Sequence, residues 1–197
     1  MFNILLDELP TEWNGCKIDT DFQIGIQISQ CMSDGSLSNA EKLFVAVSLL
    51  FGDDYAGDYA DACEAINWFL NGWNQDNISS GKGKGEKRKR EEIMDFDTDQ
   101  WRIYAAFKMQ YGIDLNTEKM HFWVYMGLLS SLEECAFTRI ISIREKEITS
   151  KMPKEERDYL SKAKAMFRIK KEEVLESDAE KEERLAAIEE FNRIRKK

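Results

Sequence analysis

Three groups of residues in this 197-residue chain have the types and spacing that catalysis or ligand binding could use. Residues 81–87, GKGKGEK, are similar to a phosphate-binding loop, in which glycines admit the phosphate and a lysine neutralises it. His121 is the only histidine, and histidine is the commonest general base. Three aspartates, at positions 95, 97 and 99, alternate at the start of a helix-forming run and could supply an acid and a base.

The run at 81–87 departs from a phosphate-binding loop at two required positions. Glu86 stands where the motif needs a glycine, and no serine or threonine follows the lysine. The six bases between 82 and 90 could neutralise nucleic-acid phosphates, but glutamates interrupt them and no aromatic residue lies among them for stacking. We interpret residues 75–92 as a flexible basic linker, and a nucleic-acid-binding regulator is the less favoured alternative.

His121 and the aspartates also have ordinary structural explanations. Glu118 lies three residues before His121, a common helical geometry that does not by itself make a catalytic pair. Acids at the start of a helix are typical caps and favourable partners of the helix dipole. We therefore expect His121 to be structural, and we expect no catalytic residues, no cofactor and no enzymatic activity.

The cysteines predict neither a metal site nor a disulfide framework. They contain no CxxC pair and no histidine at ligand spacing, and they stand at Cys16, Cys31, Cys63 and Cys135. The first residues, MFNILLDELPTEW, carry acids where a secretion signal needs a basic start. No apolar run approaches the ~18 residues of a membrane-spanning helix. We expect a cytoplasmic protein with free, mostly buried thiols.

The charge of the chain is strongly uneven along the sequence. The net charge is −9, and residues 1–74 alone hold twelve acids and two lysines, a balance of −10. An acidic first half argues against a nucleic-acid-binding face in that region. Charged residues make up 33% of the chain and only two prolines occur, which favours long, solvated helices.

Periodicity in the first half predicts a small hairpin and three helices. Residues 1–19 contain two short apolar pieces around the turn residues Asn14 and Gly15, which indicates a hairpin. The next segment, from Phe22, fits both an alternating strand and a helical face, and we choose helix. Ser38 and Glu41 have the spacing of a capping box, so a helix follows and ends at Gly52. A third helix is expected over 58–71, with its inward side chains at Tyr59, Ala62, Cys63, Ile66, Phe69 and Leu70.

An aromatic helical hairpin is the clearest feature of the second half. Its first helix ends at Gly112 and carries one aromatic face, made of Trp101, Tyr104, Phe107 and Tyr111. Its second helix is expected to begin near Asn116 or Thr117, with one stripe made of Met120, Trp123, Val124 and Leu128. A further helix follows, with Phe137, Ile140, Ile141 and Arg144.

The last part of the chain, residues 151–197, is charged and helix-prone. Its apolar stripes are narrow, and such helices usually need a partner to be stable. The first stripe begins at Tyr159 and Ala163. The residues that we predict to bind a partner are Phe167, Val174, Ile188, Phe191 and Ile194.

These patterns together predict a mainly α protein with a small N-terminal β-hairpin. We divide it into an N-terminal hairpin with helices (1–74), the basic linker (75–92), an aromatic helical hairpin with one more helix (93–150), and a charged helical extension (151–197). The segments 1–74 and 93–150 are expected to pack as one domain. The sequence leaves self-association of the chain open.

Three blocks of this sequence resemble a siphophage family named after a gene-fifteen product. They are FDTDQWRIYAAFKMQYGIDL at 96–115, MHFWVYMGLLSSL at 120–132 and FTRIISIREKEI at 137–148. The first half is similar to that family more loosely, in its LP-containing hairpin, the start at Ile18 to Phe22 and the helix at Leu37 to Leu43. Phe122 and Trp123 stand where the family has a double tryptophan, so bulk is kept. The residues of the shared structural signature are Trp101, Tyr104, Phe107, Tyr111, His121, Trp123 and Arg144.

The resemblance implies a non-enzymatic tail assembly chaperone of a long-tailed phage. Such a protein would bind and solubilise the tape measure protein during tail morphogenesis, would help to recruit the tail tube protein, and would bind neither membrane nor specific nucleic acid. It would act in the cytoplasm of the infected bacterial host and be absent from the mature virion. A structural minor tail or connector component that stays in the virion is the main alternative.

Overall fold

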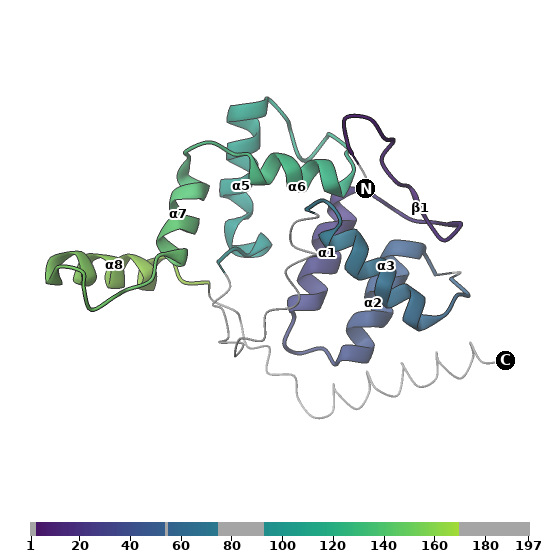
Figure 1. The fold of residues 1–197 in the computed structure, drawn as a ribbon, viewed down its shortest axis with the longest axis horizontal. Coiled ribbons are helices and arrows are strands. Elements are labelled where there is room, and N and C mark those ends of the chain that lie inside the picture. Colours follow the sequence, from purple (N-terminus) through teal and green to yellow (C-terminus); the bar gives the residue numbers. More distant parts are fainter. Residues whose placement is uncertain (1–2, 54, 75–92, 170–197) are drawn as a thin grey trace.

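The computed structural model describes residues 3–53, 55–74 and 93–169. In this part of the chain the predicted mainly α class is confirmed, with seven α-helices and one short antiparallel hairpin (Figure 1). The elements are β1 (Glu12–Trp13), β2 (Cys16–Lys17), α1 (Phe22–Ser33), α2 (Asn39–Phe51), α3 (Tyr59–Asn71), α5 (Phe96–Tyr111), α6 (Phe122–Ser130), α7 (Ala136–Glu145) and α8 (Lys154–Met166). None of the described helices is long and apolar enough to cross a membrane.

The N-terminal hairpin is present, but it is shorter than the apolar pattern suggests. Asn14 and Gly15 both have positive φ, 49° and 81°, as the two central residues of a tight hairpin turn require. Asp61 of α3 anchors this turn, because its Oδ1 accepts hydrogen bonds from Trp13 Nε1 at 3.0 Å and from Asn14 Nδ2 at 2.7 Å. The first apolar piece of the sequence, with exposed Leu5 among its residues, lies outside both strands.

Side-chain caps mark the starts of α1 and α2, two of the three helices predicted in the first half. Asp21 accepts a hydrogen bond from Gln23 N, and the ambiguous segment that follows is helix α1. Ser38 and Glu41 form the predicted capping box of α2, which ends at Gly52 with φ 83°. Gly112 likewise ends α5 in the left-handed conformation, where glycine is favoured because it has no Cβ.

The predicted start of the second aromatic helix is wrong, because α6 begins at Phe122 and not near Asn116. Asp114 holds a turn there, accepting from Asn116 N at its side chain and from Thr117 N at its carbonyl. The backbone then stays extended to pair with the residues before α1. Phe22 N donates to Met120 O at 2.9 Å, and Phe122 N donates to Thr20 O at 2.8 Å.

Several side chains lie on the opposite side from the one that the sequence predicts. Tyr59 and Cys63 of α3 are exposed, and Ala65 is buried in their place. In α6 the buried side chains are Phe122, Trp123, Tyr125 and Leu129. Of the predicted stripe, Trp123 is buried, Met120 and Leu128 are partly buried against the core, and Val124 does not belong to it. The thiols are not mostly buried either: Cys16 is exposed like Cys63, and Cys31 and Cys135 are half-buried.

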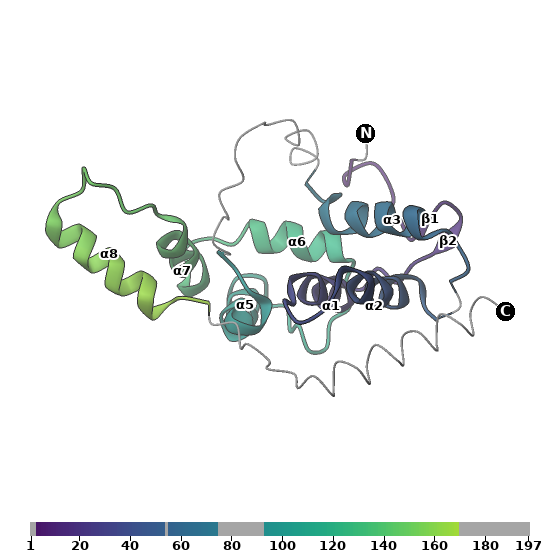
Figure 2. The ribbon, with the colours of Figure 1, turned by 90° about the horizontal axis from the view of Figure 1, so that it is seen from below.

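Helix α6 lies at the centre of the core and joins the two halves of the chain. The ring of Tyr125 stacks on Phe22 of α1 at 4.9 Å and on Phe107 of α5 at 5.1 Å. Phe122 packs so closely on α1 that a Cβ at Gly25 would lie 2.1 Å from its ring. Figure 1 shows α6 between α5 and the helices α1 and α3, and Figure 2 shows it next to both α5 and α1.

Three tryptophans connect the N-terminal hairpin to this centre. Trp68 of α3 lies between Trp13 and Trp123, with ring centroids 5.0 Å from each. The indole Nε1 of Trp123 donates to the carbonyl of Phe69 at 2.7 Å, so the polar atom of this buried ring is satisfied. The contact fixes α6 against α3.

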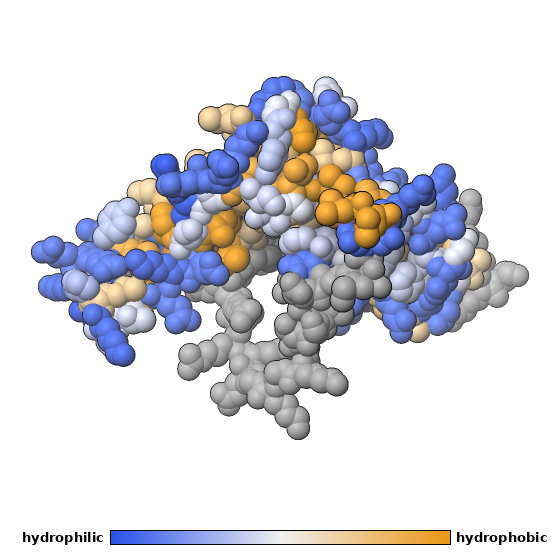
Figure 3. All heavy atoms as spheres, turned by 45° about the horizontal axis from the view of Figure 1, so that its top comes forward, coloured by the Kyte–Doolittle hydropathy of each residue, from blue (hydrophilic) through white to orange (hydrophobic). Residues whose placement is uncertain are grey.

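Helices α7 and α8 extend away from this core. Helix α7 packs on α5, and α8 packs on α7 at the end of the molecule that is farthest from α2 and α3 (Figures 1 and 2). Figure 3 shows the left end of the molecule, where α8 lies, as mostly hydrophilic, with apolar residues gathered beside it and again near the middle of the face. The sequence of α8, KEERDYLSKAKAM, explains the hydrophilic surface.

Candidate functional site

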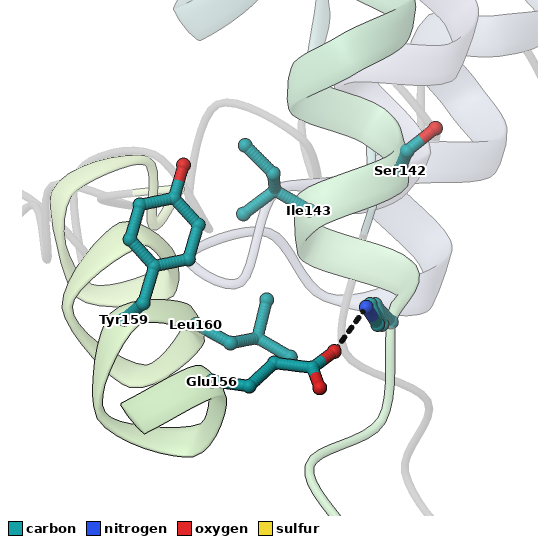
Figure 4. Close-up of a pocket in the computed structure, with 6 residues that line it drawn as sticks. Ser142, Ile143, Glu156, Tyr159 and Leu160 are labelled. Carbon is teal, nitrogen blue, oxygen red and sulfur yellow. Dashed lines mark hydrogen bonds and ion pairs between the residues drawn. The ribbon is translucent and has the colours of Figure 1, made fainter. Parts of the chain in front are cut away.

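A hollow between α7 and α8 is the candidate site for a protein partner. It has a volume of about 250 Å³ and is open to solvent, and its lining residues are Ser142, Ile143, Lys146, Glu156, Tyr159 and Leu160. In the close-up, Ile143, Tyr159 and Leu160 point toward one another across the hollow (Figure 4). Lys146 and Glu156 form an ion pair at its rim, with 2.9 Å between Nζ and Oε1. An apolar floor with a charged rim suits a protein side chain better than a small polar substrate.

Two apolar side chains and two hydrogen bonds hold α8 against α7. Leu160 and Ala163 are buried between the helices. At the end of α8, Arg144 Nε donates to the carbonyl of Phe167 at 2.6 Å, and Lys164 Nζ donates to the carbonyl of Arg144 at 2.7 Å. Cations at the C-terminal ends of both helices also complement the helix dipoles.

The predicted partner-binding residues can be placed only in part. Phe167 is half-buried directly after α8, and its carbonyl is the one that Arg144 binds. Val174, Ile188, Phe191 and Ile194 lie outside the described residues. Of the predicted stripe that begins at Tyr159 and Ala163, Tyr159 is 68% exposed and Ala163 is buried, and the neighbouring Leu160 is buried as well.

Arg144 also forms the main polar contact inside the protein. Its guanidinium makes two bonds to the carboxylate of Asp99, which is fully buried, and its Nη1 also donates to the carbonyl of Ile93 at 3.1 Å. The planar fork of an arginine matches a carboxylate in this two-bond geometry. Arg144 therefore links α5, α7, the end of α8 and Ile93, which lies three residues before α5.

The sequence of the chain was compared with known protein families. The sequence model of the family described as bacteriophage Gp15 protein matches residues 5–169, which covers every described helix. The chain belongs to the bacteriophage Gp15 protein family. No curated protein and no solved structure gives a significant match.

Membership of the bacteriophage Gp15 family gives the general class of function. It indicates a structural or morphogenesis protein of a bacteriophage. The matched range includes the α7–α8 hollow and ends at residue 169, where the described part of the chain also ends. The hollow is therefore part of the region that defines the family.

The aromatic signature residues divide between core and surface. Phe107 is fully buried, and Tyr111 is half-buried with its hydroxyl donating to the carbonyl of Leu128 at 2.9 Å. Tyr104 is half-buried and donates to Asp114 Oδ2 at 3.2 Å. Trp101 is 75% exposed, although the sequence predicts that it shares a face with the other three.

His121 is the N-cap of α6, and both of its ring nitrogens are in use. Its Nδ1 accepts from Trp123 N at 3.0 Å, so the proton lies on Nε2, which donates to the carbonyl of Pro10 at 3.0 Å. Burial lowers the pKa of His121, and the bond to Pro10 opposes this effect only in part. A neutral histidine that satisfies a helix start has a structural role in this geometry.

The three aspartates that could have formed an acid–base pair have separate positions. Asp95 caps α5 by accepting from Thr98 N at 2.6 Å, as predicted for acids at a helix start. Asp97 accepts from Gln30 Nε2 of α1 at 2.6 Å. Asp99 is the buried partner of Arg144, a role that the alternation of acids did not indicate. Across the described residues, no group of three or more metal-ligating side chains is present.

Proposed function

We propose that the protein is a tail assembly chaperone that binds and solubilises the tape measure protein of its phage. Membership of the bacteriophage Gp15 family supports this proposal, together with the resemblance of the aromatic blocks at 96–115 and 120–132 to tail assembly chaperones. In this proposal the protein is not an enzyme. It acts in the cytoplasm of the infected host and leaves before the virion is complete.

The exposed apolar side chains of α8 are the observation that carries the proposal. Tyr159 is 68% exposed and Met166 is 75% exposed, on a helix that extends from the core beside the α7–α8 hollow. Aromatic and methionine side chains are common anchors of protein interfaces. An amphipathic helix of a partner could insert its apolar side chains between α7 and α8, as helix-in-groove complexes do.

The charge of the protein fits the task of keeping a partner in solution. The chain carries a net charge of −9, and most of it lies in residues 1–74, away from α8. Many copies bound along one long helical protein would repel one another through these acidic parts, which opposes aggregation. Tail tube protein would then displace the chaperone as the tube assembles.

Co-expression with the tape measure protein of the same phage tests the proposal. We expect the tape measure protein to be insoluble alone and to elute with the chaperone as a multi-copy complex, measured by affinity pull-down and light scattering. Tyr159→Lys should weaken the complex, whereas the control Leu5→Lys should not, because Leu5 is an apolar residue that is 87% exposed in the N-terminal segment, and Figure 1 shows the N-terminus well away from α8. Phe191→Asp tests the predicted partner-binding residues beyond residue 169 in the same assay.

Mass spectrometry of purified virions separates this proposal from its main alternative. A chaperone should be missing from the particle, whereas a minor tail or connector component should be present in fixed copy number. A tape measure protein that is equally soluble with and without this chain would contradict the chaperone proposal directly.

A further inference from the structure

One stripe of α5 on the side away from the core is built from four side chains, of which three are exposed and Tyr104 is half-buried. Asp97, Trp101, Tyr104 and Lys108 follow one another at steps of four, three and four residues, so they lie on one line along the helix. Trp101 is 75% exposed, and Asp97 and Lys108 are also exposed. The rings of Trp101 and Tyr104 touch edge to face, with centroids 6.2 Å apart. We call these four residues the α5 stripe.

The core contacts of α5 come from its other side. Asp99, Ile103, Ala106 and Phe107 are the buried residues of this helix. Figure 2 looks along α5 and shows α7 on one side of it and α1 on the other, with α6 above α5 and α1 in the view. Met109, directly after Lys108 and so about 100° further around the helix, is also exposed but does not belong to the α5 stripe. A tryptophan left in solvent beside a second aromatic ring indicates an interface.

The order of side chains in the α5 stripe is self-complementary. It reads acid, aromatic, aromatic, base, so the same helix running in the opposite direction presents a base to the acid and an aromatic ring to each ring. The outer residues, Asp97 and Lys108, and the inner residues, Trp101 and Tyr104, have the same midpoint in the sequence, which falls between positions 102 and 103. A single two-fold axis at that point therefore satisfies both kinds of contact, as an isologous interface requires.

The two charges keep capacity for a new partner despite their contacts within the chain. Asp97 accepts from a neutral donor, Gln30 Nε2, at its Oδ1, and a carboxylate can accept further hydrogen bonds. Lys108 Nζ lies 3.0 Å from Asp114 Oδ2, and its side chain remains 49% exposed. An ammonium group has three donors, so Lys108 can hold Asp114 and an acid of a second molecule together.

We propose that the α5 stripe binds a second copy of this chain, in a two-fold dimer with antiparallel α5 helices. Trp101 of each copy packs on Tyr104 of the other, and Asp97 of each pairs with Lys108 of the other. The charge order selects a second copy over an unrelated helix, because each residue finds its complement in the same sequence. One helix pair is a small interface, so the dimer forms at high protein concentration and weakens with added salt.

Charge reversal tests the proposal on the full chain without any phage partner. Asp97→Lys alone and Lys108→Asp alone each place like charges opposite each other at both ends of the helix pair. In sedimentation equilibrium, each single variant should raise the dimer dissociation constant by at least about tenfold. The double variant, and an equimolar mixture of the two single variants, should both dimerise like the wild type, because opposite charges then face each other again.

The reciprocal rescue also controls for misfolding, because a misfolded chain would not be restored by mixing. Arg139→Glu is a matched control, since Arg139 is 66% exposed on α7 and lies outside the α5 stripe. A wild type that stays monomeric at millimolar concentration would overturn the proposal. A dimer that tolerates both single reversals would place the interface elsewhere. The wild type could also be a monomer that dimerises only after residues 170–197 are removed. That result would mean that this segment covers the α5 stripe in the full chain, and it would also overturn the proposed dimer.

Discussion

Arg144 of α7 binds Asp99 of α5 through two buried hydrogen bonds, 2.6 Å from Nη1 to Oδ2 and 3.1 Å from Nη2 to Oδ1. The two residues are 45 positions apart, and Asp99 has no exposed surface. A buried charge is tolerated only when it is paired and its hydrogen bonds are satisfied. The contact therefore specifies how α5 and α7 pack, and through Phe167 it also fixes the end of α8.

Removing one partner of this pair should destabilise the protein strongly. Arg144→Met removes both bonds of the Arg144 guanidinium to the buried carboxylate of Asp99 and leaves it the ion pair with Arg102, whose Nη1 lies 3.1 Å from Oδ1. We expect a loss of about 3 kcal/mol of unfolding free energy. Urea denaturation measures the change, provided that the slope of the transition is unchanged. Replacing both residues, with Asp99→Leu and Arg144→Met, should cost clearly less than the single change. Arg139→Met is the control, because its exposed pair with Glu134 contributes at most ~1 kcal/mol.

The close approach of α1 and α6 predicts opposite effects for two glycine substitutions. Gly25→Ala would place a Cβ 2.1 Å from the ring of Phe122, and forcing the helices apart should cost about 1–3 kcal/mol. Gly127→Ala lies within α6, where nothing stands within 4 Å of the new Cβ. It should stabilise the protein by roughly 0.5–1 kcal/mol through its helix preference. Thermal unfolding measures the melting temperature of each variant. Equal melting temperatures for the two variants would show that α1 and α6 are not in close contact.

The buried cap at His121 predicts a loss of stability in mild acid. Its pKa is lower in the folded state than in the unfolded chain, so protons bind the unfolded chain first. The contribution of His121 is fully present above the unfolded pKa of ~6.5 and is lost as the pH falls toward the folded pKa. His121→Asn keeps a cap acceptor for Trp123 N but does not titrate. Urea midpoints between pH 5 and pH 7.5 should therefore fall less steeply for this variant; parallel curves would mean that other groups carry the effect.

Exposure predicts two classes of cysteine reactivity. Cys16 and Cys63 are exposed and should react quickly with a thiol reagent at neutral pH. Burial raises the pKa of the Cys31 thiol, with Asp34 adding to the effect, and its Sγ lies 3.7 Å from the carbonyl of Lys42. Fewer thiolates form at such a site, so Cys31 should react slowly. Mass spectrometry at several labelling times measures each site, and equal rates at Cys31 and Cys63 would contradict the structure.

The sequence predicts helices well in this chain because their signals are local. The Ser38–Glu41 capping box, the glycines after α2 and α5, and the hairpin turn at Asn14 are each decided by a few neighbouring residues. The start of α6 could not be predicted in this way. Asn116 and Thr117 are good caps, but pairing of 120–122 with 20–22, about a hundred residues earlier, keeps the backbone extended.

The same limit applies to the candidate sites. Helical spacing groups Trp101 with Phe107, but only the neighbours of α5 decide that one is in solvent and the other in the core. Asp99 was visible in the sequence as one of three alternating acids, and nothing local separates it from Asp97. A buried aspartate needs a distant cation, and Arg144 was already a signature residue. An ion pair between Asp99 and Arg144 could therefore have been proposed from the sequence.

The central position of α6 has a consequence for how the polypeptide acquires its structure. His121 donates to the carbonyl of Pro10, Phe122 packs on Gly25, and Trp123 donates to the carbonyl of Phe69. The helices before residue 75 pack on one another, but the burial of their inner faces is complete only after α6 is synthesised. Two separate peptides, one on each side of residues 75–92, should each be largely unstructured and should assemble when mixed. The protein would then be a two-fragment complementation system, in which the gain of helical structure on mixing measures the association of the two fragments.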